Sequence, residues 1–275
     1  MSVLDEIIGG VREDLQQRKK DVPLHEIKAR AQEASEPLDV IPSFIGHSFN
    51  VIAEIKRSSP SKGELAPIAD PATLALQYQS AGACAVSVLT ESRRFKGSLA
   101  DLQVVRRAID IPILRKEFIV DDYQIYEARA YGADIILLIV VALSDDEIKN
   151  FSELTHSLGM RTLLEVHDEV ELNRVLSLYK RQELPIDLLG INARNLKTLS
   201  IDSTIFESLA GYVPNEIPLI AESGISSIEQ VIALRTAGAS GILVGETLVK
   251  DGNPERTIKD FLHRANTSNF RRLSP

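Results

Sequence analysis

Cysteine, tryptophan and long hydrophobic runs are scarce in this sequence of 275 residues. Its single cysteine, Cys84, can form neither an intrachain disulfide nor a thiolate metal site, and its apolar neighbours predict a packed small hydrophobe. The longest apolar run, residues 135–143, is far shorter than the ~20 residues of a membrane-spanning helix. Acidic residues interrupt the apolar N-terminal stretch, so a secretory signal is not expected. These absences predict a soluble, cytoplasmic protein.

Positive charge is also in deficit. The 31 Lys and Arg residues face 39 Asp and Glu residues, and the formal net charge of −8 argues against a general nucleic-acid or anionic-membrane binder. Hydrophobic residues make up 44% of the chain and charged residues 25%, which excludes disorder as the dominant state. The length fits one α/β barrel of about 250 residues with a short extension.

Eight apolar runs recur along the chain, with amphipathic stretches between them. Several of these stretches open with Ser or Asp and close at Gly, as helices do. The apolar runs are rich in Ile, Leu and Val, which is typical of parallel strands that are buried on both faces. Eight alternating units predict a (β/α)8 TIM barrel; an open doubly wound sheet is the alternative, but no G-x-G-x-x-G motif follows the first strand. The runs are residues 51–56, 83–89, 111–118, 134–140, 160–166, 186–192, 217–223 and 240–246.

The segment before the first strand carries two helical patterns, over roughly residues 2–19 and 24–35. We expect residues 1–48 to form an N-terminal helical extension that caps the barrel or folds over its mouth. Residues 49–275 would then form the catalytic barrel, in a single domain overall.

Polar residues stand at the ends of five of the eight predicted strands, where apolar residues would be ordinary. The carboxyl ends of barrel strands face the active-site mouth. Exposure to solvent or a structural ion pair could explain any one of these residues. Together they predict one polar cavity with both signs of charge, in which Lys and Glu perform the catalysis. These residues are Glu54, Lys56, Lys116, Glu165, Asn192 and Glu222.

The loops after three strands favour an anion site. The first strand runs into residues 57–63, which include Ser59, and glycines follow the seventh and eighth strands at Gly224 and Gly245. Glycine lets the backbone approach a ligand closely, and barrels commonly bind phosphate after strands 7 and 8. Either glycine alone could belong to an ordinary turn; the pair favours phosphate. The histidines show no metal-ligand spacing, although His167 follows Glu165 by two positions, and we predict no metal.

Seven segments resemble, in order, the motifs of the indole-3-glycerol phosphate synthase family. The resemblance implies a lyase of tryptophan biosynthesis that needs no metal or organic cofactor. Its reaction converts 1-(2-carboxyphenylamino)-1-deoxyribulose 5-phosphate to indole-3-glycerol phosphate, with loss of CO₂ and water. The segments are residues 51–63, 87–98, 112–134, 163–172, 190–198, 220–225 and 243–248.

The resemblance also implies roles for single residues. Lys116 would protonate the substrate carbonyl, and Glu54, Lys56 and Glu165 would share the other proton transfers; whether Lys56 or Glu165 serves dehydration stays open. Asn192 and Glu222 would hold the ribulose hydroxyls and the other side chains. The substrate carboxylate would bind Ser59 and Arg194, with help from Asn192. The aromatic ring would lie against Phe95, Phe118 and Leu138.

The same resemblance places the substrate phosphate at the loops after the last two strands. One departure is visible, because Glu246 stands where some family members carry Ser. A carboxylate that pointed inward there would repel the phosphate. The implied phosphate-binding residues are Lys56, Ser223, Gly224, Gly245 and Glu246.

Two other functions compete with this interpretation. A phosphoribosyl isomerase on the same fold would be expected to carry a Cys or Asp acid–base pair at its strand ends. A non-catalytic phosphosugar-binding barrel would keep the glycines and lose the Lys and Glu residues, all of which are present here. We therefore predict a small phosphosugar substrate, no nucleic-acid or membrane partner, and a monomer or weak homo-oligomer. An association with other tryptophan-pathway enzymes stays open.

Overall fold

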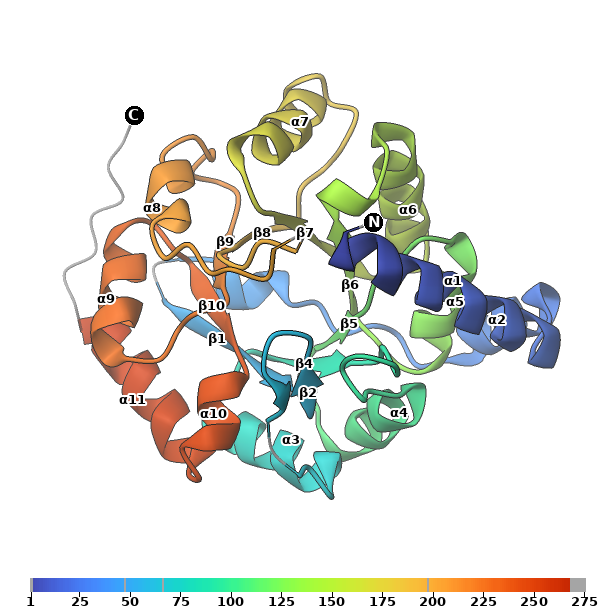
Figure 1. Cartoon of the computed structure of the whole chain (residues 1–275), viewed down its shortest axis with the longest axis horizontal. Coiled ribbons are helices and arrows are strands. Elements are labelled where there is room, and N and C mark those ends of the chain that lie inside the picture. Colours follow the sequence, from blue (N-terminus) through green and yellow to red (C-terminus); the bar gives the residue numbers. More distant parts are fainter. Residues whose placement is uncertain (1, 47, 66, 197, 268–275) are drawn as a thin grey trace.

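Eight parallel strands close into a barrel (Figure 1). The structure is a computed structural model that describes residues 2–46, 48–65, 67–196 and 198–267. Each barrel strand pairs with the next one along the chain, and β1 closes the ring by pairing with β10. Each strand overlaps one predicted apolar run, so the predicted (β/α)8 barrel is confirmed. The strands are β1 Asn50–Ile55, β4 Ala85–Leu89, β5 Ile113–Lys116, β6 Ile135–Ile139, β7 Arg161–Val166, β8 Leu188–Asn192, β9 Leu219–Glu222 and β10 Gly241–Val244.

Helices cover the outside of the barrel, and six of them begin at a Ser or Asp residue whose side chain caps the helix. These N-caps are Asp70, Ser98, Asp121, Ser144, Asp168 and Ser227, which agrees with the predicted Ser and Asp starts. The helices are α3 Pro71–Ser80, α4 Leu99–Ala108, α5 Asp122–Ala130, α6 Asp145–Ser157, α7 Glu169–Lys180, α8 Ile205–Ala210, α9 Ile228–Thr236, α10 Glu246–Lys250 and α11 Pro254–Thr267.

Four short elements were not predicted from the sequence. The loop after β1 forms an antiparallel hairpin of β2, Ser58–Ser59, and β3, Gly63–Glu64. Short 3₁₀ turns, η1 at Ile41–Phe44 and η2 at Val140–Ala142, lie before β1 and after β6. Of the predicted segments, Lys197 in the motif at 190–198 and the last residues of the predicted barrel, 268–275, lie outside the described residues.

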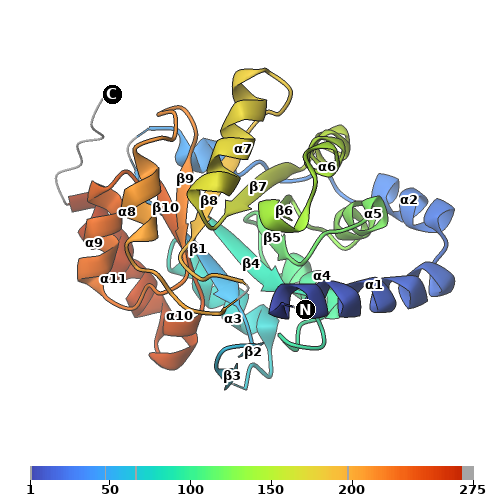
Figure 2. The same ribbon diagram turned by 45° about the horizontal axis from the view of Figure 1, so that its top comes forward.

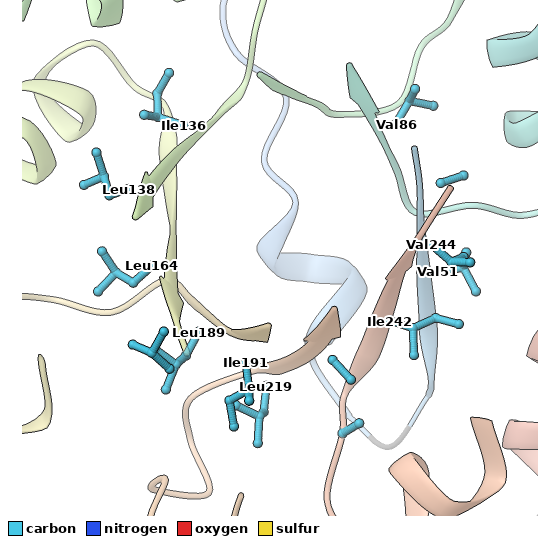
Figure 3. Packing of buried hydrophobic residues seen from close by; sticks show 14 of the residues in the cluster. Val51, Val86, Ile136, Leu138, Leu164, Leu189, Ile191, Leu219, Ile242 and Val244 are labelled. Carbon is cyan, nitrogen blue, oxygen red and sulfur yellow. The ribbon is translucent and has the colours of Figure 1, made fainter. Parts of the chain in front are cut away.

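Two apolar layers surround the strands, because alternate residues of a strand point to opposite faces. The outer layer packs against the helices, and Figure 3 shows Val51, Val86, Ile136 and Leu164 among its members. The inner layer fills the barrel with apolar side chains such as Ile52, Ala85, Leu114, Leu163, Leu188, Ile220 and Leu243. The inner layer forms an apolar floor beneath the polar residues at the carboxyl ends of the strands.

The N-terminal extension forms the two predicted helices, α1 at Val3–Asp21 and α2 at Leu24–Glu33. Figures 1 and 2 show α1 (dark blue) beside α5 and α2, with its N-terminal end toward the strands. Leu4 and Ile7 of α1 are buried with the inner layer, whereas Leu15 packs with Ile27 and Tyr123. The predicted division at residues 48 and 49 stays a prediction. None of the described helices is long and apolar enough to cross a membrane.

Surface ion pairs hold α1 against the loop that follows β4. Arg93 of that loop pairs with Glu13 at 2.8 Å and with Asp14 at 2.7 Å, and Arg94 pairs with Glu6 at 3.0 Å. Gly10 leaves room for this contact, because a Cβ at its position would lie 3.0 Å from the Arg93 side chain. The loop and the helix therefore form one cover beside the open end of the barrel.

Candidate active site

One cavity opens at the carboxyl ends of the strands, with an empty volume of about 1060 Å³ that includes its mouth. Every site residue predicted from the sequence lines this cavity except Leu138. Strands far apart in the chain are thus brought together at one site, as the barrel topology requires.

The centre of the cavity holds two ion-paired groups. Lys116 at the end of β5 donates a hydrogen bond to Glu165 of β7 and another, of 2.7 Å, to Glu222 of β9. Lys56, just beyond β1, donates to Glu54. The three carboxyl groups are at most 3% exposed, so their oxygens interact with the lysines rather than with bulk water.

Burial and neighbouring charges shift the pKa values of the two carboxyl groups beside Lys116 in opposite directions. Burial alone would raise the pKa of Glu165, but Lys116 and His167 outweigh burial and lower it. Burial raises the pKa of Glu222 to about 8, and repulsion from Glu165 adds to the effect while Lys116 opposes it. Burial would lower the pKa of Lys116, yet the surrounding carboxylates raise it. The pair therefore provides one ionised carboxylate and one proton near neutral pH.

Gly190 of β8 makes room for the Glu222 carboxylate. A Cβ at position 190 would lie 2.2 Å from Glu222 Oε1, far inside the contact distance. We expect Gly190→Ala to displace Glu222 from Lys116 and to lower kcat roughly tenfold, because small displacements of catalytic groups are costly. Steady-state kinetics check this. Gly211→Ala is the control, since nothing lies within 4 Å of its Cβ; equal kcat in the two variants would contradict the prediction.

Further polar groups gather on one side of the cavity. Arg194 donates its backbone N–H to Asn192 Oδ1 at 2.9 Å, and its guanidinium bonds to Ser61 Oγ at 2.7 Å. The hydroxyl of Ser59 is buried and has no hydrogen-bond partner within the described part of the chain. The structure brings Ser59, Asn192 and Arg194 together at the cavity as predicted, although the serine that the arginine contacts is Ser61.

Apolar side chains form the opposite wall. The rings of Phe95 and Phe118 lie 6.2 Å apart between centroids and tilt by 41°. The prediction that Leu138 is the third residue of this wall is wrong. Its side chain lies in the outer layer, between the barrel and the helices (Figure 3). Its neighbours Leu137 and Ile139 line the cavity instead. The strand is apolar on both faces, so its sequence does not show which residues point inward.

The loops after β9 and β10 form the far end of the cavity. Ser223 and Gly224 both adopt left-handed backbone angles, with φ of 68° and 73°. Such a conformation is uncommon for serine and recurs at functional sites. A Cβ at Gly245 would lie 2.9 Å from Glu54, so glycine is needed where the loop meets β1.

A family model described as indole-3-glycerol phosphate synthase matches residues 4–261. The chain belongs to the indole-3-glycerol phosphate synthase family. An indole-3-glycerol phosphate synthase of Paenarthrobacter aurescens (strain TC1) is 52% identical over 266 residues, which cover 95% of this chain and 96% of the relative. One of Mycolicibacterium gilvum (strain PYR-GCK) is 51% identical over 261 residues, covering 95% and 94%. The predicted family is confirmed, and with it the predicted lyase activity in tryptophan biosynthesis.

A solved structure shows the same fold in a different enzyme. The N-acetylmannosamine-6-phosphate 2-epimerase from Clostridium perfringens matches with a TM-score of 0.57 and 16% sequence identity, covering 82% of this chain and 97% of that one. At that identity the likeness concerns the barrel alone. The assignment to the indole-3-glycerol phosphate synthase family therefore depends on the sequence relatives, which match along nearly the whole chain.

The departure at Glu246 has a structural compensation in this member of the synthase family. The Glu246 carboxylate pairs with Lys62 of the β2–β3 turn and with Lys250 of α10. Burial alone would raise the pKa of Glu246, but the two lysines outweigh burial and lower it. The carboxylate is therefore ionised, and two cations neutralise the charge that would otherwise repel an anion.

Several residues of this synthase cavity were missed from the sequence. Leu4 and Ile7 of α1 line it, and so does Glu117, which directly follows the last residue of β5. The spacing of Leu4 and Ile7, three residues apart on a helix, was the available signal for one apolar face. His167, which does not line the cavity, pairs with Glu165 at 3.1 Å, a contact that the sequence did not predict. Among the described residues, no group of three or more His, Cys, Asp and Glu could hold a metal ion.

Proposed function

We propose that this chain closes the indole ring in the cavity at the carboxyl end of its barrel. The substrate would be 1-(2-carboxyphenylamino)-1-deoxyribulose 5-phosphate, and the products indole-3-glycerol phosphate, CO₂ and water. The observation that carries the proposal is the Lys116 ammonium, held between Glu165 and Glu222 above an apolar floor. This ammonium can deliver a proton to a carbonyl oxygen where water is scarce.

The chemistry explains why the proposed reaction needs no metal or organic cofactor. The ring carbon that bears the carboxylate attacks the substrate ketone, and the carbonyl oxygen takes up a proton. The resulting iminium accepts the electron pair of the carbon–carboxylate bond as CO₂ leaves. The hydroxyl then departs as water after a second protonation, and loss of one ring proton completes the aromatic indole.

Each proton transfer has a candidate group at the cavity. Lys116 would protonate the ketone, and Glu54, Lys56 and Glu165 would share the later transfers. Asn192 and Glu222 would hold the ribulose hydroxyls. The orphaned Glu222 Oε1, which has no hydrogen-bond partner among the residues that the structure describes, supports a contact with substrate.

The two anionic ends of the substrate would bind on different sides. Ser59 and Arg194 offer a hydroxyl and a guanidinium to the carboxylate. The phosphate would meet the backbone of Ser223, Gly224, Gly245 and Glu246, with Lys56 reaching it from β1. The aromatic ring would lie against Phe95 and Phe118. This apolar wall would leave the carboxylate poorly solvated and so favour its loss as CO₂.

A direct assay tests the proposal. Incubating the purified protein with the carboxyphenylamino-deoxyribulose phosphate should release CO₂ and produce indole fluorescence. The chain contains no tryptophan, so its own indole fluorescence does not obscure the product. Turnover of phosphoribosylanthranilate instead would identify an isomerase. Binding of the phosphosugar without CO₂ release would identify a non-catalytic barrel, and either result would refute the proposal.

We also propose that α1 forms part of the substrate site. Ile7 lines the cavity and is 5% exposed, so Ile7→Ala should remove apolar contact with substrate and raise KM about tenfold. Leu15→Ala is the matched control on the same helix, because Leu15 packs with Ile27 and Tyr123 away from the cavity. It should lower the free energy of unfolding by about 2–4 kcal/mol with KM unchanged. An unchanged KM in Ile7→Ala would make α1 a structural brace only.

Two further expectations concern localisation and oligomeric state. We propose a cytoplasmic enzyme that acts as a monomer or weak homo-oligomer. Size-exclusion chromatography with light scattering at micromolar concentration measures its state of association.

A further inference from the structure

Two carboxylates share the Lys116 ammonium, but their other surroundings differ. Glu165 Oε1 lies 3.1 Å from Nε2 of His167. For Glu222, Lys116 is the cation that the structure places in contact, and its Oε1 has no partner in the described ranges. The contact with His167 therefore distinguishes Glu165 from Glu222, which both bind Lys116.

The histidine is held from its other side by α7. Its side chain is 5% exposed, and its Nδ1 lies 3.0 Å from Glu171 Oε2. The same oxygen accepts a hydrogen bond of 2.8 Å from the His167 backbone N–H. Glu171 lies in the first turn of α7, where the helix dipole favours a carboxylate, and its own N–H donates to the N-cap Asp168. The ring is thereby fixed with Nε2 toward Glu165.

Both ring nitrogens of His167 face carboxylate oxygens, and these are Glu165 of β7 and Glu171 of α7, with Lys116 of β5 beyond Glu165. A neutral imidazole would turn one lone pair against an anionic oxygen, whereas the imidazolium has a proton on each nitrogen. Burial alone would lower the pKa of His167, but the two carboxylates outweigh burial and raise it to about 9. Nε2 is not aligned with Glu165 as a hydrogen bond, so the contact acts as a close ion pair.

We propose that His167 is a positioning residue for this reaction. As an imidazolium clamped by Glu171, it keeps Glu165 ionised and oriented toward Lys116, so that a proton shared by the two carboxylates resides on Glu222. The catalytic part of this inference rests on the proposed function. The two carboxyl groups beside Lys116 would then have different roles. Glu165 would accept a proton, and Glu222 would donate one to a substrate oxygen.

The expected signature is a displaced pH profile. His167→Gln keeps an amide near the Nε2 position but removes the charge. Loss of this cation raises the pKa of Glu165, so the acid limb of kcat/KM should move to higher pH by about one unit. The maximal kcat should fall about tenfold. Glu171→Gln weakens the clamp from the other side and should move the acid limb in the same direction.

His156→Asn is the matched control. His156 also pairs with a carboxylate, Asp187, at 2.6 Å, but it does not line the cavity. Its pH profile should coincide with that of the unmodified enzyme. A merely structural His167 would lower the melting temperature and the yield of active enzyme while the acid limb stayed in place, and that result would overturn the proposal.

A second readout needs no substrate. Nitrogen-15 NMR of the histidines in the full chain, with His167→Gln to assign the signal, should show both ring nitrogens of His167 protonated at pH 7.5. Glu171→Gln should lower the pH at which this signal titrates. A neutral His167 at pH 7.5 would overturn the inference. A chain that failed to release CO₂ from the substrate would refute the proposed function instead, with the protonation of His167 still measurable.

Discussion

Replacing Lys116 by methionine is expected to lower kcat by about 10²–10⁴-fold while leaving the barrel folded. The proposed reaction begins with a proton transfer to the ketone, and Lys116 is the ammonium held by Glu165 and Glu222 at the centre of the cavity. Methionine fills a similar volume and cannot supply that proton. Because the contact strengthens in the transition state, kcat and kcat/KM should fall together.

The folded state should survive this change for an electrostatic reason. Without Lys116, the pKa of Glu222 would rise further, so the proton that Glu222 holds near neutral pH keeps the two buried carboxyl groups from facing each other as two anions. Circular dichroism and steady-state kinetics measure the two effects separately. Lys149→Met, on the outer face of α6, is the control and should retain full turnover. Near-normal turnover in Lys116→Met would remove this lysine from the role of general acid.

Replacing the neighbouring Arg115 should have the opposite outcome, a large loss of stability. Its side chain is completely buried and donates to Glu127 at 2.8 Å, to the carbonyl of Gln124 at 2.8 Å and to Thr90 at 3.1 Å. Arg115→Met would leave Glu127 buried, with the partly exposed Arg18 as its one cationic partner among the described residues. Removing one member of a buried ion pair costs about 3–5 kcal/mol, and we expect that loss in urea unfolding.

Two further variants separate this effect from a general cost of losing an arginine. Arg107→Met on the exposed face of α4 should leave the free energy of unfolding unchanged within about 0.5 kcal/mol. Adding Glu127→Gln to Arg115→Met should restore part of the stability, because it removes the charge left without its partner. A destabilisation by Arg115→Met of under 1 kcal/mol would show that water or a rearranged Arg18 replaces the lost contacts.

Strands and site residues could be predicted where apolar periodicity or an unusual charge distinguishes them. Prediction failed where the sequence offers neither. Glu54, Lys116 and Glu222 interrupt apolar strands at their carboxyl ends, and the barrel brings those ends together. Leu138 was misplaced, because a strand that is apolar on both faces does not reveal its inner side.

His167 shows a second limit of prediction from the sequence. A histidine two residues beyond a strand glutamate has several possible partners, and only the fold adds Glu171 from α7. The contribution of α1 to the cavity was missed for a similar reason. Its apolar spacing indicates a buried face, but the surface that it covers depends on tertiary packing.

The ion pairs that hold α1 against the loop after β4 respond to salt differently from the charges inside the barrel. Arg93 and Arg94 make their contacts at the surface, where added ions screen charges over about 10 Å at 0.1 M and about 3 Å at 1 M. Lys116 and its carboxylates are shielded by burial from that screening. A rise in ionic strength should therefore loosen the cover of the cavity, and with it substrate affinity, before it weakens the chemical step.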